Sequence, residues 1–223
     1  LSIIHYQLSI DSYLYPMNIK QHIPNFITVL NLVCGVFAIL LFIKFTFPID
    51  EGLKGLINRS YIVIEYGILL ILIATILDFL DGFAARILKV QSEIGAQLDS
   101  LADMVTFGLA PGFLFYAMCN EFYPEDNYLK YLFILIPIFS AIRLAKFNVD
   151  EEQTTYFKGL ATPANAIFWI SMFNLTLSLQ TEGLEYFKYV LIILIIGFSL
   201  LMTSNLRMFS LKLKNLKLEG DNI

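Results

Sequence analysis

Long apolar runs recur along this chain of 223 residues, and they limit what it can fold into. The hydrocarbon core of a bilayer is about 30 Å thick, which an α-helix of roughly 20 apolar residues can cross. Six segments meet this requirement: 26–43, 61–80, 96–118, 128–147, 162–179 and 186–204. Hydrophobic residues make up 57% of the chain and charged residues only 15%, against about 25% charged residues in typical soluble domains. We therefore expect an all-α integral membrane protein with six transmembrane helices, and we exclude a nucleic-acid-binding, disordered or collagen-like chain.

The six expected spans form one transmembrane domain, residues 23–210, between two short flanking segments. An N-terminal arm covers residues 1–22, of which 1–16 are expected to be dispensable. Residues 20–26 can form a short interfacial helix before the first span, with an ordered tail of no function as the alternative. A tail of residues 211–223 follows the last span. Most of the 15 Lys and Arg residues lie on the side of both termini, so we expect that side to be cytoplasmic.

Four aspartates interrupt the apolar pattern of the second and third spans. With their specified neighbours they form one pattern: Asp78, Asp81, Gly82, Ala85, Arg86, Gly95, Asp99 and Asp103. Spacings of three and four residues put both aspartates of a pair on one face of a helix. The rise of about 1.5 Å per residue puts both pairs near the cytoplasmic ends of their spans. Because the connection is short, the two helices are expected to be antiparallel neighbours with four converging carboxylates.

Converging carboxylates repel one another unless cations neutralise them. A charge at the centre of a membrane span costs about 2.5–3.5 kcal/mol, and two divalent cations would balance four carboxylates. Ligands that are all oxygen favour Mg²⁺, Mn²⁺ or Ca²⁺ over zinc. The alternatives are solvated helix caps and an ion or proton pathway. Arg86, on the same helix face as Gly82, is suited to bind a phosphate, which favours a phosphate-bearing ligand over simple cation passage.

The pattern D-x2-D-G-x2-A-R-x8-G-x3-D-x3-D resembles the signature of the CDP-alcohol phosphotransferases. The resemblance implies the six-helix fold of that family and a homodimeric enzyme in a prokaryotic cell membrane, with its active site facing the cytoplasm. Members transfer a phosphate-linked lipid group from a CDP-linked donor to an alcohol and release CMP. For this chain the resemblance implies two Mg²⁺ or Mn²⁺ ions bound by Asp78, Asp81, Asp99 and Asp103, with Asp103 also the catalytic base. It implies that Gly82, Ala85 and Arg86 line the site of the CDP group.

Four further stretches, 23–35, 98–111, 143–148 and 157–164, resemble the family members that use CDP-diacylglycerol as donor and L-serine as acceptor. Ala161 stands where many relatives have proline. Serine is therefore the expected acceptor, with glycerol 3-phosphate or inositol phosphate as alternatives. An ion or proton transporter is the alternative from another class.

Polar residues outside the pattern are further candidates for substrate contacts. Asn25, Thr28 and Asn31 in the first span are predicted to hold the CDP group or shape its pocket. Three further residues are predicted to bind the acceptor or the phosphate of the donor: Arg143, Lys146 and Thr106. For the three residues of the first span, the alternative is hydrogen bonding between helices. For Arg143 and Lys146 it is snorkelling to the membrane interface, and for Thr106 it is ordinary packing. The C-terminal lysines Lys212, Lys214 and Lys217 are expected to contact anionic membrane lipids.

Overall fold

The computed structural model describes residues 19–47, 61–90, 92–126, 128–149, 157–179 and 181–208. The predictions for residues 1–16, for the tail 211–223 and for its lysines lie outside these residues. The structural statements below concern the described residues.

Helices make up nearly all of the described structure, as the apolar runs predict. In chain order the elements are α2 (Ile19–Thr46), α3 (Tyr61–Leu88), α4 (Glu93–Asp103), the π-helix η2 (Met104–Leu109), α5 (Ala110–Phe122), the 3₁₀-helix η3 (Leu129–Ile134), α6 (Leu135–Val149), β1 (Phe157–Lys158), α7 (Thr162–Ser178), α8 (Thr181–Thr203) and β2 (Arg207–Met208). Because α4, η2 and α5 are continuous, as are η3 and α6, the described residues form six helical runs.

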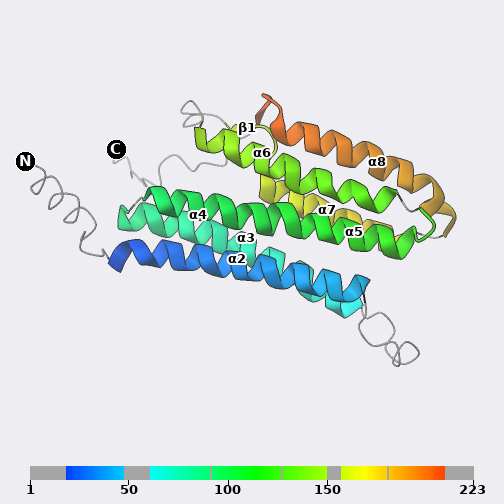
Figure 1. Cartoon of the computed structure of the whole chain (residues 1–223), viewed down its shortest axis with the longest axis horizontal. Helices are drawn as coiled ribbons and strands as arrows, with labels where there is room; N and C mark the ends of the chain where they lie inside the picture. Colours follow the sequence, from blue (N-terminus) through cyan, green and yellow to red (C-terminus); the bar gives the residue numbers. More distant parts are fainter. Residues whose placement is uncertain are drawn as a thin grey trace, which may run out of the picture.

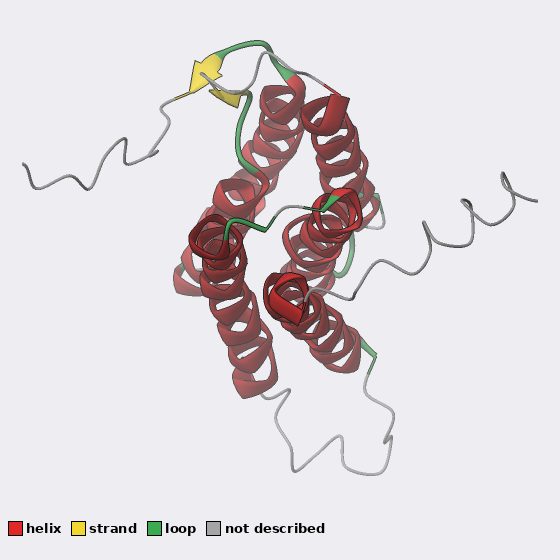
Figure 2. Ribbon diagram, turned by 90° about the vertical axis from the view of Figure 1, so that its left-hand side faces the viewer, coloured by secondary structure: helices red, strands yellow, loops and turns green. Residues whose placement is uncertain are grey.

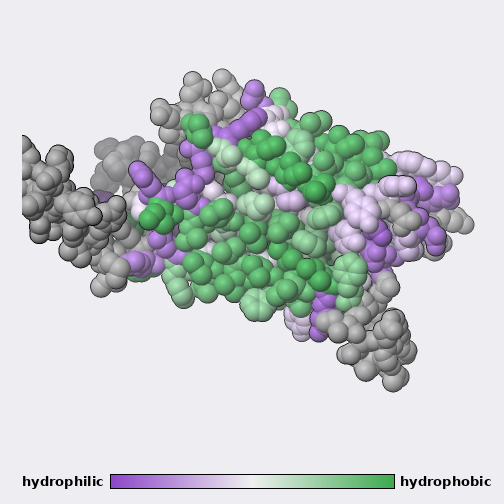
Figure 3. Space-filling view, in the orientation of Figure 1, coloured by the Kyte–Doolittle hydropathy of each residue, from purple (hydrophilic) through white to green (hydrophobic). Residues whose placement is uncertain are grey.

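Five of these runs are long and apolar enough to cross a membrane. They are His22–Thr46, Tyr61–Leu88, Glu93–Phe122, Leu129–Val149 and Leu184–Thr203. On the face seen in Figure 3, apolar side chains cover the middle of the molecule and polar side chains gather toward both ends. The protein is therefore a multi-pass membrane protein. The sixth predicted span corresponds to α7, which has 17 residues and is not among the five, so six spans are not confirmed.

The run α4–η2–α5 lies in the middle of the bundle. It separates α2 and α3 on one side from α6 and α8 on the other (Figure 1). In its apolar 18-residue window 61% of the residues are buried inside the protein, against 22–28% in the corresponding windows of the other four spans. Its buried side chains include Phe115, whose ring meets Trp169 of α7 edge-on at 5.0 Å between centroids. This central run therefore packs mainly against protein, which allows it to carry polar residues that a lipid-facing helix would expose.

The N-terminal end of the first span differs from the prediction of a separate interfacial helix. Residues 19–46 form one continuous helix, with Pro24 inside it. The carbonyl of Pro24 accepts a hydrogen bond from the Thr28 hydroxyl at 3.0 Å. Pro24 lies close to the start of α2, where few preceding carbonyls remain for its ring to obstruct. The segment 20–26 is thus the first part of α2, and the prediction of a distinct interfacial helix was wrong at this boundary.

Two short strands connect distant parts of the chain at one end of the bundle. β1 pairs with β2 in antiparallel register, with Phe157 opposite Met208 and Lys158 opposite Arg207. Figure 2, which views the molecule from that end, shows the strands in yellow beside the helix ends. The segment that precedes α7 is thereby joined to the residues that follow α8.

Candidate active site

A tight turn between α3 and α4 brings the two halves of the aspartate pattern together. Lys89, just after α3, has a positive φ of 51°, and the Val90 N–H donates to the Ala85 carbonyl at 3.1 Å. Ser92 then caps α4, because its hydroxyl accepts a hydrogen bond from the Gly95 N–H at 2.9 Å. An N-cap of this kind satisfies one of the N–H groups that a helix start leaves without a partner. α3 and α4 therefore run in opposite directions from this turn, but α4 packs mainly against α2, so the prediction that α3 and α4 are directly adjacent was wrong.

Three of the four predicted ligands form a compact carboxylate cluster. Single carboxylate oxygens of Asp78, Asp99 and Asp103 lie within 4.8 Å of one another, and all three side chains are partly buried. The Oδ1 atoms of Asp99 and Asp103 are buried and have no hydrogen-bond partner among the described residues. A buried carboxylate oxygen without a donor is costly unless a cation accompanies it. The oxygen-only donor set and these unpartnered oxygens therefore fit a divalent cation.

Asp81, the fourth predicted ligand, is not part of this compact group. Its side chain is buried, only 5% exposed, and its Oδ2 accepts a hydrogen bond from the Thr28 hydroxyl at 2.7 Å. Thr28 lies on α2, so this bond joins the first span to the aspartate-bearing helix. Asp81 nevertheless lines the same cavity as Asp99. The structure thus places three carboxylates together and sets Asp81 beside them, against α2.

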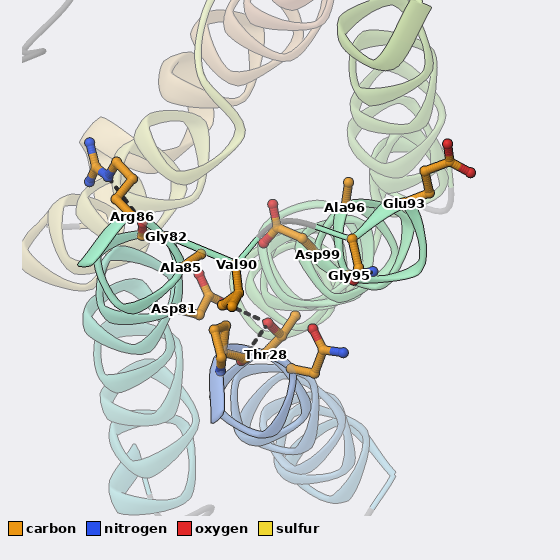
Figure 4. Close-up of a pocket in the computed structure, with 13 residues that line it drawn as sticks. Thr28, Asp81, Gly82, Ala85, Arg86, Val90, Glu93, Gly95, Ala96 and Asp99 are labelled. Carbon is orange, nitrogen blue, oxygen red and sulfur yellow. Dashed lines mark hydrogen bonds between the residues drawn. The ribbon is translucent and has the colours of Figure 1, made fainter. Parts of the chain in front are cut away.

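A cavity of about 650 Å³ opens between α2, α3 and the start of α4. Its lining residues are Pro24, Asn25, Thr28, Asp81, Gly82, Ala85, Arg86, Val90, Ser92, Glu93, Gly95, Ala96 and Asp99 (Figure 4). Cavities of about 300–1,000 Å³ are typical of small-molecule sites. Five of the six residues predicted to hold the CDP group or shape its pocket are in this set, and they come from two separate helices. The sixth, Asn31, is fully buried and does not line the cavity. Val90, Ser92, Glu93 and Ala96 were not predicted, since no residue type among them points to nucleotide chemistry.

Glycines leave room at two points of this cavity. No atom lies within 4 Å of the position that a Cβ on Gly82 would occupy, so the cavity is open there. A Cβ on Gly95 would lie 2.8 Å from Asn25 Oδ1, which shows how closely α4 approaches α2. The Arg86 side chain is exposed, and its Nε donates to the Gly82 carbonyl at 3.0 Å. Figure 4 shows it extending outward at the cavity edge, where an arginine can reach a phosphate.

Of the three residues predicted for the acceptor, Arg143 and Lys146 lie close together on α6, and Thr106 lies apart from them. Arg143 is partly buried and donates from Nη1 to the Thr162 hydroxyl at 3.5 Å. Lys146 is exposed and donates to the Thr203 carbonyl at 3.2 Å. Thr106 is fully buried, and its hydroxyl donates to the Asn31 carbonyl at 3.2 Å, so it joins η2 to α2 and does not line the cavity. The structure therefore places Thr106 in helix packing and leaves Arg143 and Lys146 at the end of α6.

The π-helix after Asp103 is a feature of the site that sequence reasoning missed. Met104–Leu109 form η2 directly beyond the last aspartate, within the otherwise α-helical central run. Such bulges often occur at functional sites. Gly35 of α2 packs against it so closely that an added Cβ would lie 2.9 Å from the Thr106 Cα. No residue pattern identifies a π-helix reliably, so only the structure reveals this widened turn.

A second missed contact joins the aspartate-bearing helix to α6. The Asn148 amide donates to the Ser100 hydroxyl at 3.0 Å. Ser100 follows Asp99 directly, so this bond holds the start of the central run against the end of α6. Asn148 belongs to the stretch 143–148, which resembles the family members that use serine, but nothing in the sequence indicates that Ser100 is its partner.

The carboxylate cluster beside a cavity, in a bundle of long apolar helices, fits a membrane enzyme that binds a divalent cation and a phosphate-bearing substrate. The chain belongs to the CDP-alcohol phosphatidyltransferase family, whose sequence model it matches over residues 21–203. It is therefore a phosphatidyltransferase of a family that is generally metal-dependent.

Curated relatives carry one shared description, CDP-diacylglycerol–serine O-phosphatidyltransferase. The chain is 34% identical to the Bacillus subtilis protein over 170 residues, which cover 74% of this chain and 85% of that one. It is 30% identical to the Mycobacterium tuberculosis H37Rv protein over 195 residues, covering 84% of this chain and 61% of that one. It is 33% identical to the Methanocaldococcus jannaschii protein over 153 residues, covering 69% and 61%. The chain thus spans most of the Bacillus relative and about three fifths of the other two.

Proposed function

We propose that the chain is a phosphatidylserine synthase, which transfers the phosphatidyl group of CDP-diacylglycerol to the hydroxyl of L-serine and releases CMP. The observation that carries this proposal is the cluster of Asp78, Asp99 and Asp103 beside a cavity large enough for a nucleotide. The shared description of the bacterial and archaeal relatives supports serine as the acceptor. The retention of the complete aspartate pattern supports the chemistry of the family.

The cavity between α2, α3 and α4 suits the CDP part of the donor. Gly82 and Ala85 leave space for the pyrophosphate to approach the helix backbone, and Arg86 offers a cationic contact at the edge. Asn25 and Thr28 supply hydrogen-bonding groups from α2. Exposed apolar side chains such as Phe79 and Phe83 lie on the outer surface of α3 nearby, where the acyl chains of the donor can remain in the bilayer.

The donor set of the site fits two divalent cations, which we propose are Mg²⁺ or Mn²⁺. Asp78, Asp99 and Asp103 would hold them from the compact cluster, and Asp81 would contribute from beside it. When bound there, such cations polarise the phosphorus and stabilise the negative charge of departing CMP. Thr28 orients Asp81 through its 2.7 Å hydrogen bond, as partners of ligating carboxylates commonly do.

Asp103 is proposed to act as the general base. It takes the proton from the serine hydroxyl as that oxygen forms a bond to the donor phosphorus. The bond between this phosphorus and the CMP oxygen breaks, so one displacement gives phosphatidylserine and CMP without a covalent enzyme intermediate. Asp103 can combine this role with metal contact because its carboxylate has two oxygens, one for the cation and one for the proton.

We propose that the site faces the cytoplasm of a prokaryotic cell and that the catalytic domain, residues 23–210, works as a homodimer. The concentration of Lys and Arg at the site end supports this orientation. Arg86, Arg143 and Lys146 all lie at that end, close to the aspartate-bearing turn or the end of α6.

Parallel acceptor assays test the proposed function. Purified protein is given CDP-diacylglycerol and Mn²⁺ with labelled L-serine, glycerol 3-phosphate or inositol phosphate. We expect label from serine alone to enter lipid, with one CMP released for each lipid formed. Preferential incorporation of either phosphorylated acceptor would contradict the serine assignment. Cation or proton flux in sealed liposomes without any lipid donor would support the transporter alternative.

A further inference from the structure

Asn31 of α2 lies outside the donor cavity, although the sequence predicts it near the CDP group. Its side chain is fully buried, and neither Oδ1 nor Nδ2 has a hydrogen-bond partner among the described residues. A buried amide without a partner destabilises a fold, and an apolar side chain of similar size would avoid that cost. Asn31 is therefore a candidate for a role beyond the packing of α2.

The buried side of α2 is a stripe of residues at helical spacing. Its members are Pro24, Thr28, Asn31, Gly35, Ala38, Phe42 and Phe45. Intervals of three and four residues put all of them on one face of the helix. Since α2 packs against α3 and against the central run, this face meets both elements that carry the aspartates.

One hydrogen bond sets the level of Asn31 relative to α3. The Thr28 hydroxyl donates to Asp81 Oδ2 at 2.7 Å. α2 and α3 run antiparallel and side by side (Figure 1). Three residues farther along α2 is Asn31, and three residues back along α3 is Asp78. Asn31 therefore lies at the level of Asp78, on the face of α2 that meets α3.

The central run places Asn31 at the level of a second aspartate. A Cβ on Gly95 would lie 2.8 Å from Asn25 Oδ1, and farther along both helices the Thr106 hydroxyl donates to the Asn31 carbonyl at 3.2 Å. Asp103 lies three residues before Thr106 in the same helical run, so the two share a face. A helix carbonyl points toward the C-terminus, whereas the Cβ tilts toward the N-terminus. The side chain of Asn31 is therefore directed away from Thr106, toward the level of Asp103.

The atoms that lack partners complement one another. Asn31 Nδ2 is a buried donor, while the Oδ1 atoms of Asp99 and Asp103 are buried acceptors, all without a partner among the described residues. The carboxylate cluster itself consists of acceptors alone. A neutral amide can hold a carboxylate in one orientation, as the partners of ligating carboxylates commonly do. A carboxylate has about four lone-pair sites, so such a bond leaves room for a cation and a proton.

We propose that Asn31 is a positioning residue of the carboxylate cluster, whose amide N–H groups donate to the carboxylate of Asp103. This proposal rests on the proposed function, since it takes Asp103 as the base and the cluster as the cation site. The Thr106 bond to the Asn31 carbonyl joins α2 to η2 and keeps the amide at this level. The π-helix thereby acquires a function in the site, because it presents Thr106 to α2.

Mn²⁺ binding and steady-state kinetics of Asn31→Leu test the proposal. We expect the Mn²⁺ dissociation constant of the donor-free protein, measured from the electron paramagnetic resonance signal of unbound Mn²⁺, to rise about tenfold. The kcat at saturating Mn²⁺ should fall about 10–100-fold. The KM for CDP-diacylglycerol should stay unchanged, because Asn31 does not line the donor cavity. A purely structural role predicts wild-type Mn²⁺ affinity and kcat, and this result would overturn the proposal.

Asn174→Leu is the matched control. Asn174 lies toward the far end of α7, and its amide donates to the Ile170 carbonyl at 3.0 Å. The same substitution there should leave Mn²⁺ affinity and kcat at their wild-type values. Equal losses in Asn31→Leu and Asn174→Leu would overturn the proposal, because they would reflect the loss of any amide from the bundle.

Asn31→Asp keeps the test decisive if Asn31→Leu fails to fold. Aspartate has nearly the same shape, but in its ionised form it cannot donate and it repels Asp103, so kcat should again fall about 10–100-fold. A cation ligand at this position would still function as aspartate, so a kcat within a few-fold of wild type would overturn the proposal. Wild-type protein that binds Mn²⁺ but incorporates no serine would overturn the proposed function. Normal serine incorporation with unaffected Asn31 variants would overturn the positioning role alone.

Discussion

Asp103→Asn should reduce phosphatidyl transfer by about 10²–10⁴-fold, the usual contribution of a general base, and by more if metal binding is also weakened. Asparagine has nearly the same shape as aspartate, but it cannot accept the serine proton and brings no negative charge to the cation site. The carboxylates of Asp78 and Asp99 would remain within reach of the same point. The measurement is the rate of CMP release from CDP-diacylglycerol with saturating serine.

The control for this variant lies at the other end of the bundle. Asp126 forms an ion pair with Lys188, with 3.2 Å between Oδ2 and Nζ. Ion pairs at the protein surface contribute little to stability, and this one lies away from the carboxylate cluster, so Asp126→Asn should retain normal turnover. Both variants should elute from size exclusion like the wild type, which separates lost chemistry from lost folding. Turnover within a few-fold of wild type in Asp103→Asn would rule out its role as base.

Removal of divalent cations is the second change with a large expected effect. Chelation with EDTA should bring CMP release down to background, and added Mn²⁺ or Mg²⁺ should restore it. The reason is electrostatic: several carboxylates face one small volume, and at least two buried oxygens there have no protein donor among the described residues. Without cations, these groups repel the pyrophosphate of the donor.

The matched control for chelation is EDTA added already saturated with Mg²⁺, which should leave the rate unchanged. Full activity after exhaustive dialysis against chelator would be incompatible with a cation site at the cluster. Restoration by Zn²⁺ but not by Mg²⁺ or Mn²⁺ would indicate ligands other than these oxygen donors.

Local periodicity was sufficient to predict the helices and the grouping of their aspartates. Span length follows from bilayer thickness, and spacings of three and four residues follow from the helical repeat, so neither depends on tertiary detail. The shared face of Asp99 and Asp103 and the proximity of Asp78 followed from these rules. Asn25 and Thr28 were predicted to lie at the cavity because they belong to the stretch 23–35 that resembles the family. Nothing in the local sequence connects them with Asp81.

Features that depend on how helices meet could not be predicted in this way. Asp81 lies beside the cluster because α2 presents Thr28 to it, and a helical repeat contains no information about that approach. Thr106 turned toward Asn31 because the π-helix changes the register of the side chains after Asp103. The paired strands β1 and β2 have two residues each and lie about 50 positions apart, so they are too short for an alternating pattern to be visible.

α7 also shows that the length of an apolar segment is not sufficient to predict a membrane span. The segment 162–179 carries no charged residue, yet α7 ends at Ser178 after 17 residues. Several of its side chains, including Trp169 and Phe173, are buried against the central run rather than exposed to lipid. Composition alone does not distinguish a helix buried in protein from one that faces the bilayer.

The location of bound Mn²⁺ tests the central claim most directly. Crystals grown with Mn²⁺ and CDP-diacylglycerol, measured at the manganese absorption edge, would reveal each ion by its anomalous scattering. We predict peaks within about 2.0–2.6 Å of carboxylate oxygens of Asp78, Asp99 and Asp103, the range of divalent cations bound by oxygen. Occupied manganese positions elsewhere, with these three carboxylates bound to no ion in the presence of the donor lipid, would contradict the claim.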